Sequence, residues 1–410
     1  MLIGKTTSVC PVCLAKIPAR KIVGEDGNIY MEKECWEHGS FQTLIWEGNL
    51  ESYQAWASGD TGGAVMPVRA QPVEKGCPYD CGLCQNHERD GCCVLLELTN
   101  RCNLKCPVCF ASAGEQKPHD LSLAEIGKQY DLLMERGGPF NIQLSGGEPT
   151  MRDDLDQIIA LGREKGFSFF QLNTNGVRLA KEKGYAAHLK NAGVSVAFLQ
   201  FDGLDDAIYR TLRGAPLLET KLRAIDNCKA AGLPVVLVPT VAPGVNDQAL
   251  GDILKFALSR APHVRGVHIQ PISYFGRCGL EAPEVRLTIP AVLRRIEEQT
   301  EGLMKVTDFD DGIYELMAKE KDPRWRVPYA KIKDKRTYVQ ETTADFGIEN
   351  GLSIDVFPLD NWSEHKKRAV TQARYCGLMR RFLTASIEKT FKTPRTGIKK
   401  FILFMIWKYS

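Results

Sequence analysis

Three cysteines of the chain have a spacing that suits iron–sulfur chemistry. Cys102, Cys106 and Cys109 form a C-x3-C-x2-C pattern directly after the apolar stretch 94–99. Thiolates that converge from one loop suit three corners of a cubane cluster, whereas ordinary electron-transfer clusters take four thiolates. One iron would then stay open to a ligand from outside the protein. A zinc site, or an electron-transfer cluster completed by a distant thiol, is the alternative interpretation.

Short polar motifs follow the next apolar stretches. They are Gly146, Gly147 and Glu148 after 141–144, Asn173 and Asn175 at the end of 167–173, and Asp202 after 194–201. Glycines let the backbone approach a ligand closely, and a carboxylate accepts hydrogen bonds from an ammonium group. Taken singly, the glycines and asparagines are also typical turn formers.

A second C-x3-C-x2-C pattern lies upstream of the first. Cys77, Cys81 and Cys84 form it, and Cys92 and Cys93 come close behind. A fourth thiol nearby would close this second cluster, which suits electron relay or structural support. We favour Cys92 over Cys93 as the fourth ligand, and a structural zinc site is the alternative.

The N-terminal segment holds a two-plus-two set of metal ligands. Cys10 and Cys13 form one pair, and Cys35 and His38 form the other, with 21 residues between the pairs. Zinc is the usual occupant of three thiolates and one imidazole, and mononuclear iron fits too. The segment is not strongly basic, so we expect structural support and no binding of nucleic acid.

The distribution of cysteine narrows the class of protein. Of the 14 cysteines in 410 residues, 8 lie between Cys77 and Cys109. A secreted disulfide scaffold would be short and would open with a signal peptide, but residues 1–19 contain no long apolar run and already include Cys10. No stretch reaches the roughly 18 apolar residues needed to cross a bilayer. We therefore expect a metal-rich cytoplasmic protein.

Strand-like and helical segments alternate regularly from residue 94 onward. The strand-like stretches are 94–99, 141–144, 167–173, 194–201, 234–241 and 264–271, and the helical ones between them are 122–136, 154–164, 178–191, 217–231 and 248–259. This pattern predicts βαβ units and a parallel sheet, either an open sheet or an incomplete barrel. In both cases ligands gather at the carboxyl ends of the strands.

The predicted fold class is therefore α/β, a parallel (β/α)6 partial barrel with small N-terminal metal-binding modules and a C-terminal α+β fragment. We place the zinc or iron knuckle at 1–56, a connector with the upstream cysteines at 57–93, the barrel at 94–308 and a further segment at 309–410. A change in charge supports the last boundary, since residues 310–410 carry 20 Lys and Arg against 13 Asp and Glu.

The cysteine triad followed by Gly146-Gly147-Glu148 resembles the radical S-adenosylmethionine (SAM) superfamily. The resemblance implies that Cys102, Cys106 and Cys109 bind a 4Fe-4S cluster whose open iron is chelated by SAM. It also implies that an electron delivered to the sulfonium releases a 5′-deoxyadenosyl radical, which abstracts hydrogen. The segment 146–148 would hold the methionine amino group.

The resemblance leaves other contacts to SAM open. Asn173, Asn175 and Asp202 are further candidates, because they lie at the same rim. No flavin or nicotinamide motif is present, so we expect reduced ferredoxin or flavodoxin as the electron donor.

The combination of the knuckle, the upstream cysteines and the triad resembles one branch of this superfamily over residues 7–308. That branch includes archaeal tetraether lipid synthases and proteins linked to pterin methylation. It implies carbon–carbon bond formation or methyl-group chemistry at an unactivated C–H position of a small molecule, a lipid or a pterin-like ring. The branch continues into a further cysteine-bearing region, whereas Cys228, Cys278 and Cys376 are isolated here and are expected to pack in cores.

Residues 309–410 resemble a different family, the LicD enzymes that move phosphocholine-like groups onto glycans. The stretches 322–331 and 351–360, with Asp355 and Asp360, carry this resemblance. An aspartate run that would hold a divalent metal is not recognisable, so we expect a fragment without transferase activity. A phosphotransferase with a vestigial radical half would require such a set near Asp308–Asp311.

The last residues are basic and end in an apolar run. Residues 364–410 hold 12 Lys and Arg against 2 acidic residues, and 401–407 are apolar. Such a tail can make peripheral contact with an anionic membrane, or form a core helix with a basic face. For the whole chain, the competing class is a non-catalytic iron–sulfur electron-transfer or scaffold protein that binds no SAM.

Overall fold

The computed structural model describes residues 1–13, 15–57, 93–115, 120–135, 138–274, 276–281 and 286–306. It also describes the backbone of strands at residues 329–332, 337–342, 351–357 and 400–407. Some predicted site residues lie outside these ranges, namely Cys77, Cys81, Cys84, Cys92, Asp308–Asp311 and Asp360. The auxiliary cluster therefore stays a prediction.

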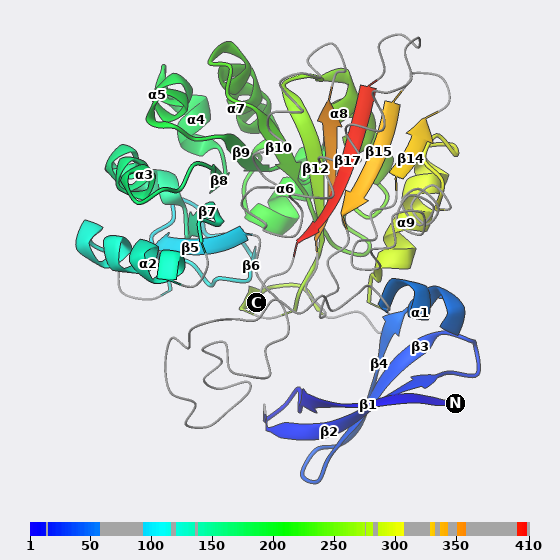
Figure 1. Ribbon diagram of the computed structural model, residues 1–410. Coiled ribbons are helices and arrows are strands. Elements are labelled where there is room, and N and C mark those ends of the chain that lie inside the picture. The colour runs from blue at the N-terminus through cyan, green and yellow to red at the C-terminus, as the bar shows by residue number, and fades with distance from the viewer. Residues whose placement is uncertain are drawn as a thin grey trace, which may run out of the picture.

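The N-terminal module is a four-stranded antiparallel sheet. Its strands follow chain order and are β1 (Leu2–Val9), β2 (Lys16–Val23), β3 (Ile29–Cys35) and β4 (Gly39–Trp46). Helix α1 (Leu50–Ala57) follows them (Figure 1). One small buried cluster holds Cys10, Ile17 and Cys35, with Phe41 packed against it. A core of this size stabilises a sheet weakly by itself, which is why small modules often depend on a bound metal.

Six parallel strands form the central sheet, as predicted. They are β5 (Cys93–Thr99), β7 (Asn141–Gly146), β8 (Phe170–Thr174), β9 (Val196–Gln200), β10 (Val235–Val238) and β12 (Val264–Pro271). Their spatial order is the chain order, from β5 at the edge to β12. A doubly wound sheet would reverse its order at a switch point. The structure therefore decides for the incomplete barrel over the open sheet.

Helices cover the outer side of this sheet (Figure 1). They are α2 (Leu123–Glu135), α3 (Leu155–Glu164), α4 (Val177–Lys181), α5 (Tyr185–Ala192), α7 (Leu218–Ala230), α8 (Leu250–Ser259) and α9 (Ile289–Gln299). Helix α6 (Asp206–Arg213) instead packs beside the cysteine loop, where Leu212 contacts the cluster of Val108 and Ala242. The predicted helix 178–191 is two helices, because Gly184 has a left-handed φ of 82° between them. Helix α6 was not predicted. It begins where the Asp205 carboxylate accepts a hydrogen bond from Ala207 N.

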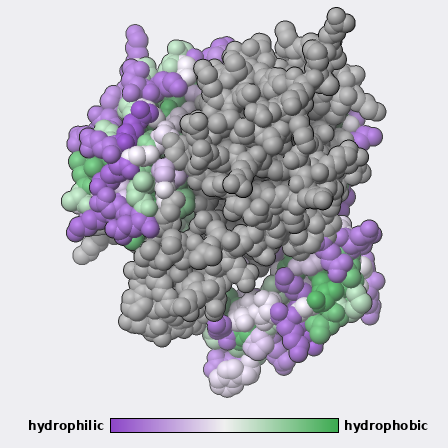
Figure 2. All heavy atoms as spheres, in the orientation of Figure 1, coloured by the Kyte–Doolittle hydropathy of each residue, from purple (hydrophilic) through white to green (hydrophobic). Residues whose placement is uncertain are grey.

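The two faces of the sheet have different surroundings. Alternate residues such as Ile142, Leu144, Phe170 and Leu172 belong to the large core shared with the helices. The residues between them point to the inner face of the barrel. The described solvent-facing surface of helices α2–α5 is largely hydrophilic (Figure 2). The helices predicted at 122–136 and 154–164 are thus confirmed as α2 and α3.

Four further strands extend the sheet beyond β12. They are β14 (Tyr329–Ile332), β15 (Thr337–Thr342), β16 (Gly351–Phe357) and β17 (Lys400–Trp407). Strand β16 pairs antiparallel with β12, and Asp355 lies opposite Gly266. The apolar run 401–407 belongs to β17 between β15 and β16, so the predicted core helix there was wrong. A short, wholly apolar run suits a strand with partners on both sides. In the part of the chain that is described, no helix has the length and apolar character to cross a bilayer.

The glycines of two outer helices give a matched test of this packing. A methyl group at Gly162 of α3 would lie 2.7 Å from a ring atom of Phe170, whereas one at Gly127 of α2 would meet its nearest neighbour at 3.6 Å. We predict that Gly162→Ala lowers the free energy of unfolding in urea by about 1–3 kcal/mol. Gly127→Ala should be neutral or stabilising by up to about 1 kcal/mol, because alanine favours helix. Equal losses in both variants would contradict this packing.

Candidate active site and metal centre

The cysteine loop lies between β5 and α2 and is held by the far end of the barrel. Its strand β6 (Val108–Cys109) pairs antiparallel with β13 (Arg277–Cys278), which follows β12. Arg277 Nε donates to the carbonyl oxygen of Cys106 at 2.7 Å, and its Nη1 forms an ion pair with Glu115 at 2.7 Å. A residue about 170 positions away in the sequence thus holds the cysteine loop in place.

The two glycines after β7 allow the chain to pack against the entry to the cysteine loop. Gly147 N donates to Thr99 O at 2.7 Å, and Glu148 N donates to Arg101 O at 2.8 Å. A Cβ atom at Gly147 would lie 2.2 Å from Arg101 O, and Gly146 has a φ of 122°. Only glycine permits this contact. The motif therefore positions Arg101, the residue before Cys102. This role does not depend on any contact of the motif with SAM.

Glu148 is a buried acceptor that joins three segments. Its Oε1 accepts hydrogen bonds from Thr150 N, Thr150 Oγ1 and Thr174 Oγ1 at 2.6–3.1 Å. Its Oε2 accepts from Asn175 N at 2.6 Å. The carboxylate thus links the end of β7, the short 3-10 helix Pro149–Met151 and the end of β8. Contact between Glu148 and the ammonium group of SAM stays a prediction.

Both backbone polar groups of Asn175, its N–H and its carbonyl, make hydrogen bonds to buried side chains. Its N–H donates to Glu148, and its carbonyl oxygen accepts from Lys221 Nζ at 2.6 Å. Its side-chain amide donates to Oδ1 of Asn103 at 2.6 Å, and Asn103 is the residue that follows Cys102. Lys221 is fully buried, and burial lowers its pKa to about 8. Glu148 and Lys221 are therefore connected through the backbone of one residue, whose side chain contacts the cysteine loop.

Asp202 is paired with a buried arginine. Arg213 Nε and Nη2 donate to its two carboxylate oxygens at 2.7 Å each, and Thr240 N donates to Oδ1 at 3.0 Å. Arg213 Nη1 also reaches Val108 O, between Cys106 and Cys109, at 3.2 Å. Asp202 is thus placed beneath the cysteine loop, and direct contact with SAM stays a prediction for it.

Asn173 lies on the inner face of the barrel. Its Oδ1 accepts from Gln143 Nε2 at 2.8 Å and from Gln171 Nε2 at 3.3 Å, and its Nδ2 donates to Ser145 Oγ at 3.3 Å. The structure therefore separates the two asparagines that the sequence grouped together. Asn175 faces the cysteine loop, and Asn173 faces the interior.

The cysteine loop fits a thiolate-bound cluster. Burial raises the pKa of Cys102 to about 11 and also raises that of Cys106, although Arg213 acts in the opposite direction on Cys106. Thiols of this kind keep their protons until a metal displaces them. Cys102, Cys106 and Cys109 come from one loop and would supply three thiolates, which is the donor set of a cluster with an open iron.

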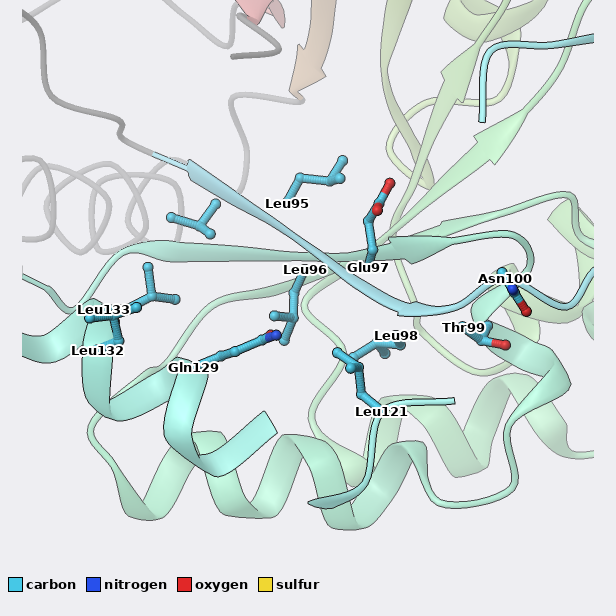
Figure 3. Close-up of a pocket in the computed structure, with 11 residues that line it drawn as sticks. Leu95, Leu96, Glu97, Leu98, Thr99, Asn100, Leu121, Gln129, Leu132 and Leu133 are labelled. Atoms are coloured by element: carbon cyan, nitrogen blue, oxygen red, sulfur yellow. The ribbon is translucent and has the colours of Figure 1, made fainter. Parts of the chain in front are cut away.

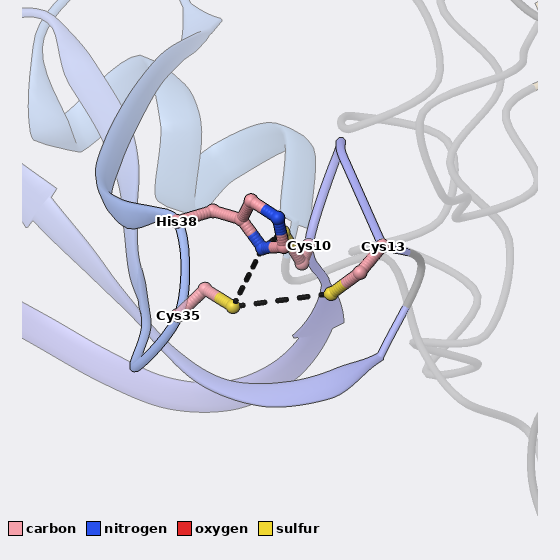
Figure 4. A group of neighbouring side chains, drawn as sticks. All are labelled: Cys10, Cys13, Cys35 and His38. Carbon is pink, nitrogen blue, oxygen red and sulfur yellow. Dashed lines mark hydrogen bonds between the residues drawn. The ribbon is translucent and has the colours of Figure 1, made fainter.

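The N-terminal module brings its four predicted ligands together (Figure 4). Cys10 and Cys13 come from the β1–β2 turn, and Cys35 and His38 from the β3–β4 turn. Cys13 Sγ and Cys35 Sγ are 3.9 Å apart, and His38 Nδ1 lies 3.7 Å from Cys10 Sγ and 3.5 Å from Cys35 Sγ. Tetrahedral zinc with its usual bond lengths needs ligand spacings of about 3.5–3.8 Å. The site therefore fits a four-coordinate metal.

Four positioning residues were missed in the sequence: Asn103, Arg213, Lys221 and Arg277. Lys221 carried a usable signal, because it lies on the apolar stripe of α7 with Ala224, Ile225 and Cys228. A lysine at such a position predicts a buried partner. Arg213 and Arg277 carried no local signal, because their partners lie far away in sequence.

Comparison with known proteins agrees with this site. Residues 96–257 match the radical SAM superfamily, and residues 2–47 match the HMPTM N-terminal zinc ribbon domain. The chain carries a radical SAM domain. This is the domain of an enzyme, and it contains the cysteine loop, the segment 146–148 and Asp202.

Two curated relatives match longer stretches of the chain than the domain itself. The chain is 43% identical over 309 residues to a 7,8-dihydro-6-hydroxymethylpterin dimethyltransferase of Methanocaldococcus jannaschii, a match that covers 74% of this chain and 60% of the relative. It is 33% identical over 212 residues to a GTP 3′,8-cyclase of Paenarthrobacter nicotinovorans, covering 50% and 58%. The chain thus spans about 60% of the length of these curated relatives. The solved structure of methylornithine synthase matches with 17% identity and a TM-score of 0.40 over 52% of this chain and 64% of that one.

The buried pair beneath the cysteine loop gives a second test. Arg213→Met leaves the Asp202 carboxylate buried without its partner, so we predict a loss of about 3–5 kcal/mol in the free energy of unfolding. The control is Arg223→Met, whose ion pair with Glu219 is largely exposed and should contribute about 0.5 kcal/mol or less. Urea titration of both variants measures the difference. Similar losses would show that Arg213 does not compensate a buried charge.

The zinc ribbon of this radical SAM chain gives a third test. Cys13→Ala removes one of four ligands, so we predict that bound zinc falls from about one ion per chain to nearly none. Elemental analysis of purified protein measures zinc and iron together. Cys228→Ala, in the barrel core, should retain the zinc. Iron in place of zinc, lost in Cys13→Ala alone, would identify mononuclear iron instead.

Proposed function

We propose that this protein cleaves SAM reductively and uses the resulting radical to functionalise an unactivated C–H position of a small, pterin-like substrate. Methyl transfer is the favoured reaction, and carbon–carbon bond formation on a lipid is the second candidate. The observation that carries the proposal is the identity of 43% with a protein named as a pterin dimethyltransferase, together with the cysteine loop at the strand ends.

The residues of the radical SAM domain have separate roles in this proposal. Cys102, Cys106 and Cys109 would hold a 4Fe-4S cluster, which when bound supplies the electron that cleaves the sulfonium. The segment 146–148 would position the methionine part of SAM. Asn175 and Asp202 hold the loop from below, through Asn103 and Arg213. Their fixed network keeps the site ordered before the substrate binds.

Further cofactors and partners follow from the cysteine pattern. Cys77, Cys81, Cys84 and Cys92 would hold an auxiliary 4Fe-4S cluster that relays electrons or supports the fold. Reduced ferredoxin or flavodoxin would supply the electron. The zinc ribbon would have a structural role. The LicD-like interpretation of residues 309–410 and peripheral contact of the basic tail with an anionic membrane remain predictions.

Cleavage of SAM tests the proposal directly. After anaerobic reconstitution with iron and sulfide, the reduced protein should form 5′-deoxyadenosine from SAM. Cys106→Ala should reduce this product to background, because two thiolates do not hold the cluster. Cys228→Ala should retain activity, since Cys228 is buried in α7 away from the loop.

The same experiment separates the competing classes. Intact iron–sulfur clusters with no 5′-deoxyadenosine, under conditions that reduce them, would favour the electron-transfer or scaffold protein. Transfer of a phosphodiester group with divalent metal alone would favour the LicD-type phosphotransferase. Methylated product, detected by mass spectrometry with isotopically labelled SAM, would distinguish methyl transfer from carbon–carbon coupling.

A further inference from the structure

A row of polar side chains crosses the inner face of the barrel one layer below the cysteine loop. Glu97 on β5 lies opposite Ser145 on β7, and Asn173 on β8 lies opposite Phe198 on β9. Ser145 and Asn173 are joined by a hydrogen bond of 3.3 Å. The side chains of Glu97 and Leu95 point away from Leu96 and Leu98, which face α2 (Figure 3). The row therefore runs across four neighbouring strands.

The row changes character along its length. It begins with the carboxylate of Glu97, continues through a hydroxyl and an amide, and ends at the ring of Phe198. Phe198 lies next to Val236 and within 5.8 Å of the His268 ring, measured between centroids. Neighbouring strands are about 4.8 Å apart, so Glu97 and Asn173 are separated by roughly 10 Å. This length suits the polar edge of a bicyclic ring.

The layer below the row is also polar. Gln143 and Gln171 lie opposite each other and both donate to Asn173. Asn141, two residues deeper than Gln143 on the same face, is 4% exposed, and its Oδ1 has no hydrogen-bond partner. A buried acceptor without a partner is costly, and such groups often indicate an absent ligand or water.

We propose that Glu97, Ser145 and Asn173 form the subsite for the polar edge of a planar, uncharged heterocycle with adjacent N–H donors, with Phe198 at its apolar end. This inference rests on the proposed function and adds the residues that recognise its substrate. A carboxylate accepts from two neighbouring N–H groups at once, as in an amino-pyrimidinone edge. An amide can both donate to a ring carbonyl and accept from a ring N–H.

Other substrate classes match this face poorly. The residues of the row and of the polar layer below it include no Lys or Arg, so a phosphate or carboxylate substrate would face Glu97 without a counter-charge from these residues. Burial lowers the pKa of His268 to about 3, which keeps that ring neutral. A lipid tail would cover the carboxylate and amides without pairing with them, which is unfavourable.

The position of the row connects it to the radical chemistry. Glu97 comes two residues before Thr99, and Ser145 comes two residues before Gly147. The backbones of Thr99 and Gly147 contact each other at the entry to the cysteine loop. A ring held by the row would lie directly below the segment 146–148. The row is thus placed to present a ring C–H position to the radical formed above it.

Binding by the reconstituted full chain tests the inference. The probes are 7,8-dihydro-6-hydroxymethylpterin and quinoxaline, a flat bicycle without N–H donors, titrated calorimetrically in the presence of SAM. We expect the wild type to prefer the pterin. Glu97→Gln should weaken pterin binding by about tenfold or more and leave quinoxaline binding unchanged, because it replaces one acceptor by a donor. Ser145→Ala, a second variant, should weaken pterin binding by a few-fold.

Controls distinguish recognition from folding and from the proposed function. Glu164→Gln makes the same charge change on the exposed surface of α3 and should alter neither probe. Equal weakening of pterin and quinoxaline in Glu97→Gln, or no weakening, would overturn the inference. So would a wild type that forms 5′-deoxyadenosine but does not bind the pterin. A wild type that binds the pterin with this selectivity but never cleaves SAM would instead refute the proposed function.

Discussion

The site depends on a close backbone contact between the ends of the first two barrel strands. Gly147 N and Glu148 N donate to the carbonyl oxygens of Thr99 and Arg101 at 2.7 and 2.8 Å. This contact places the residue before Cys102, and so helps to position the loop that carries the three cysteines. Side chains are excluded there, because a Cβ on either glycine would meet backbone at 2.2 Å. The glycines are therefore needed even before any ligand binds.

Buried charges hold the rest of the loop. Glu148 and Lys221 bind the two backbone groups of Asn175, and Asp202 pairs with Arg213. In a low-dielectric interior such pairs are tolerated when every oxygen and N–H has a partner. The partners come from several strands and helices, so the network also fixes the relative positions of these elements. The cysteine loop thus lies on buried charged side chains that have hydrogen-bonding partners.

The zinc ribbon and the barrel differ in what stabilises them. The zinc ribbon has a small core, and its ligands come from two hairpin turns that a metal would join. The barrel has a large apolar core on its helical side, which is a source of stability that the zinc ribbon lacks. The polar inner face of the barrel is available to bind a substrate. Loss of metal should therefore affect stability in the first region and activity in the second.

Local sequence determined the elements and the ligand sets. Strand β12 lies where the apolar run predicted it, and four ligands with knuckle spacing meet at Cys10, Cys13, Cys35 and His38. Periodicity and short spacings encode such features within a few turns of chain. The predictions failed where long-range pairing decides: residues 400–407 form a strand because β15 and β16 flank them.

Only the tertiary structure decided which polar residues share a site. Asn173 and Asn175 are two residues apart and would share a face in a continuous strand. Strand β8 ends at Thr174, so Asn173 faces the interior and Asn175 bonds to Asn103. Arg277 reaches Cys106 from the other end of the barrel. Glu97 joins Ser145 and Asn173 only because their strands are neighbours in register. Sequence fixes which groups exist, whereas the closure of the sheet fixes which groups meet.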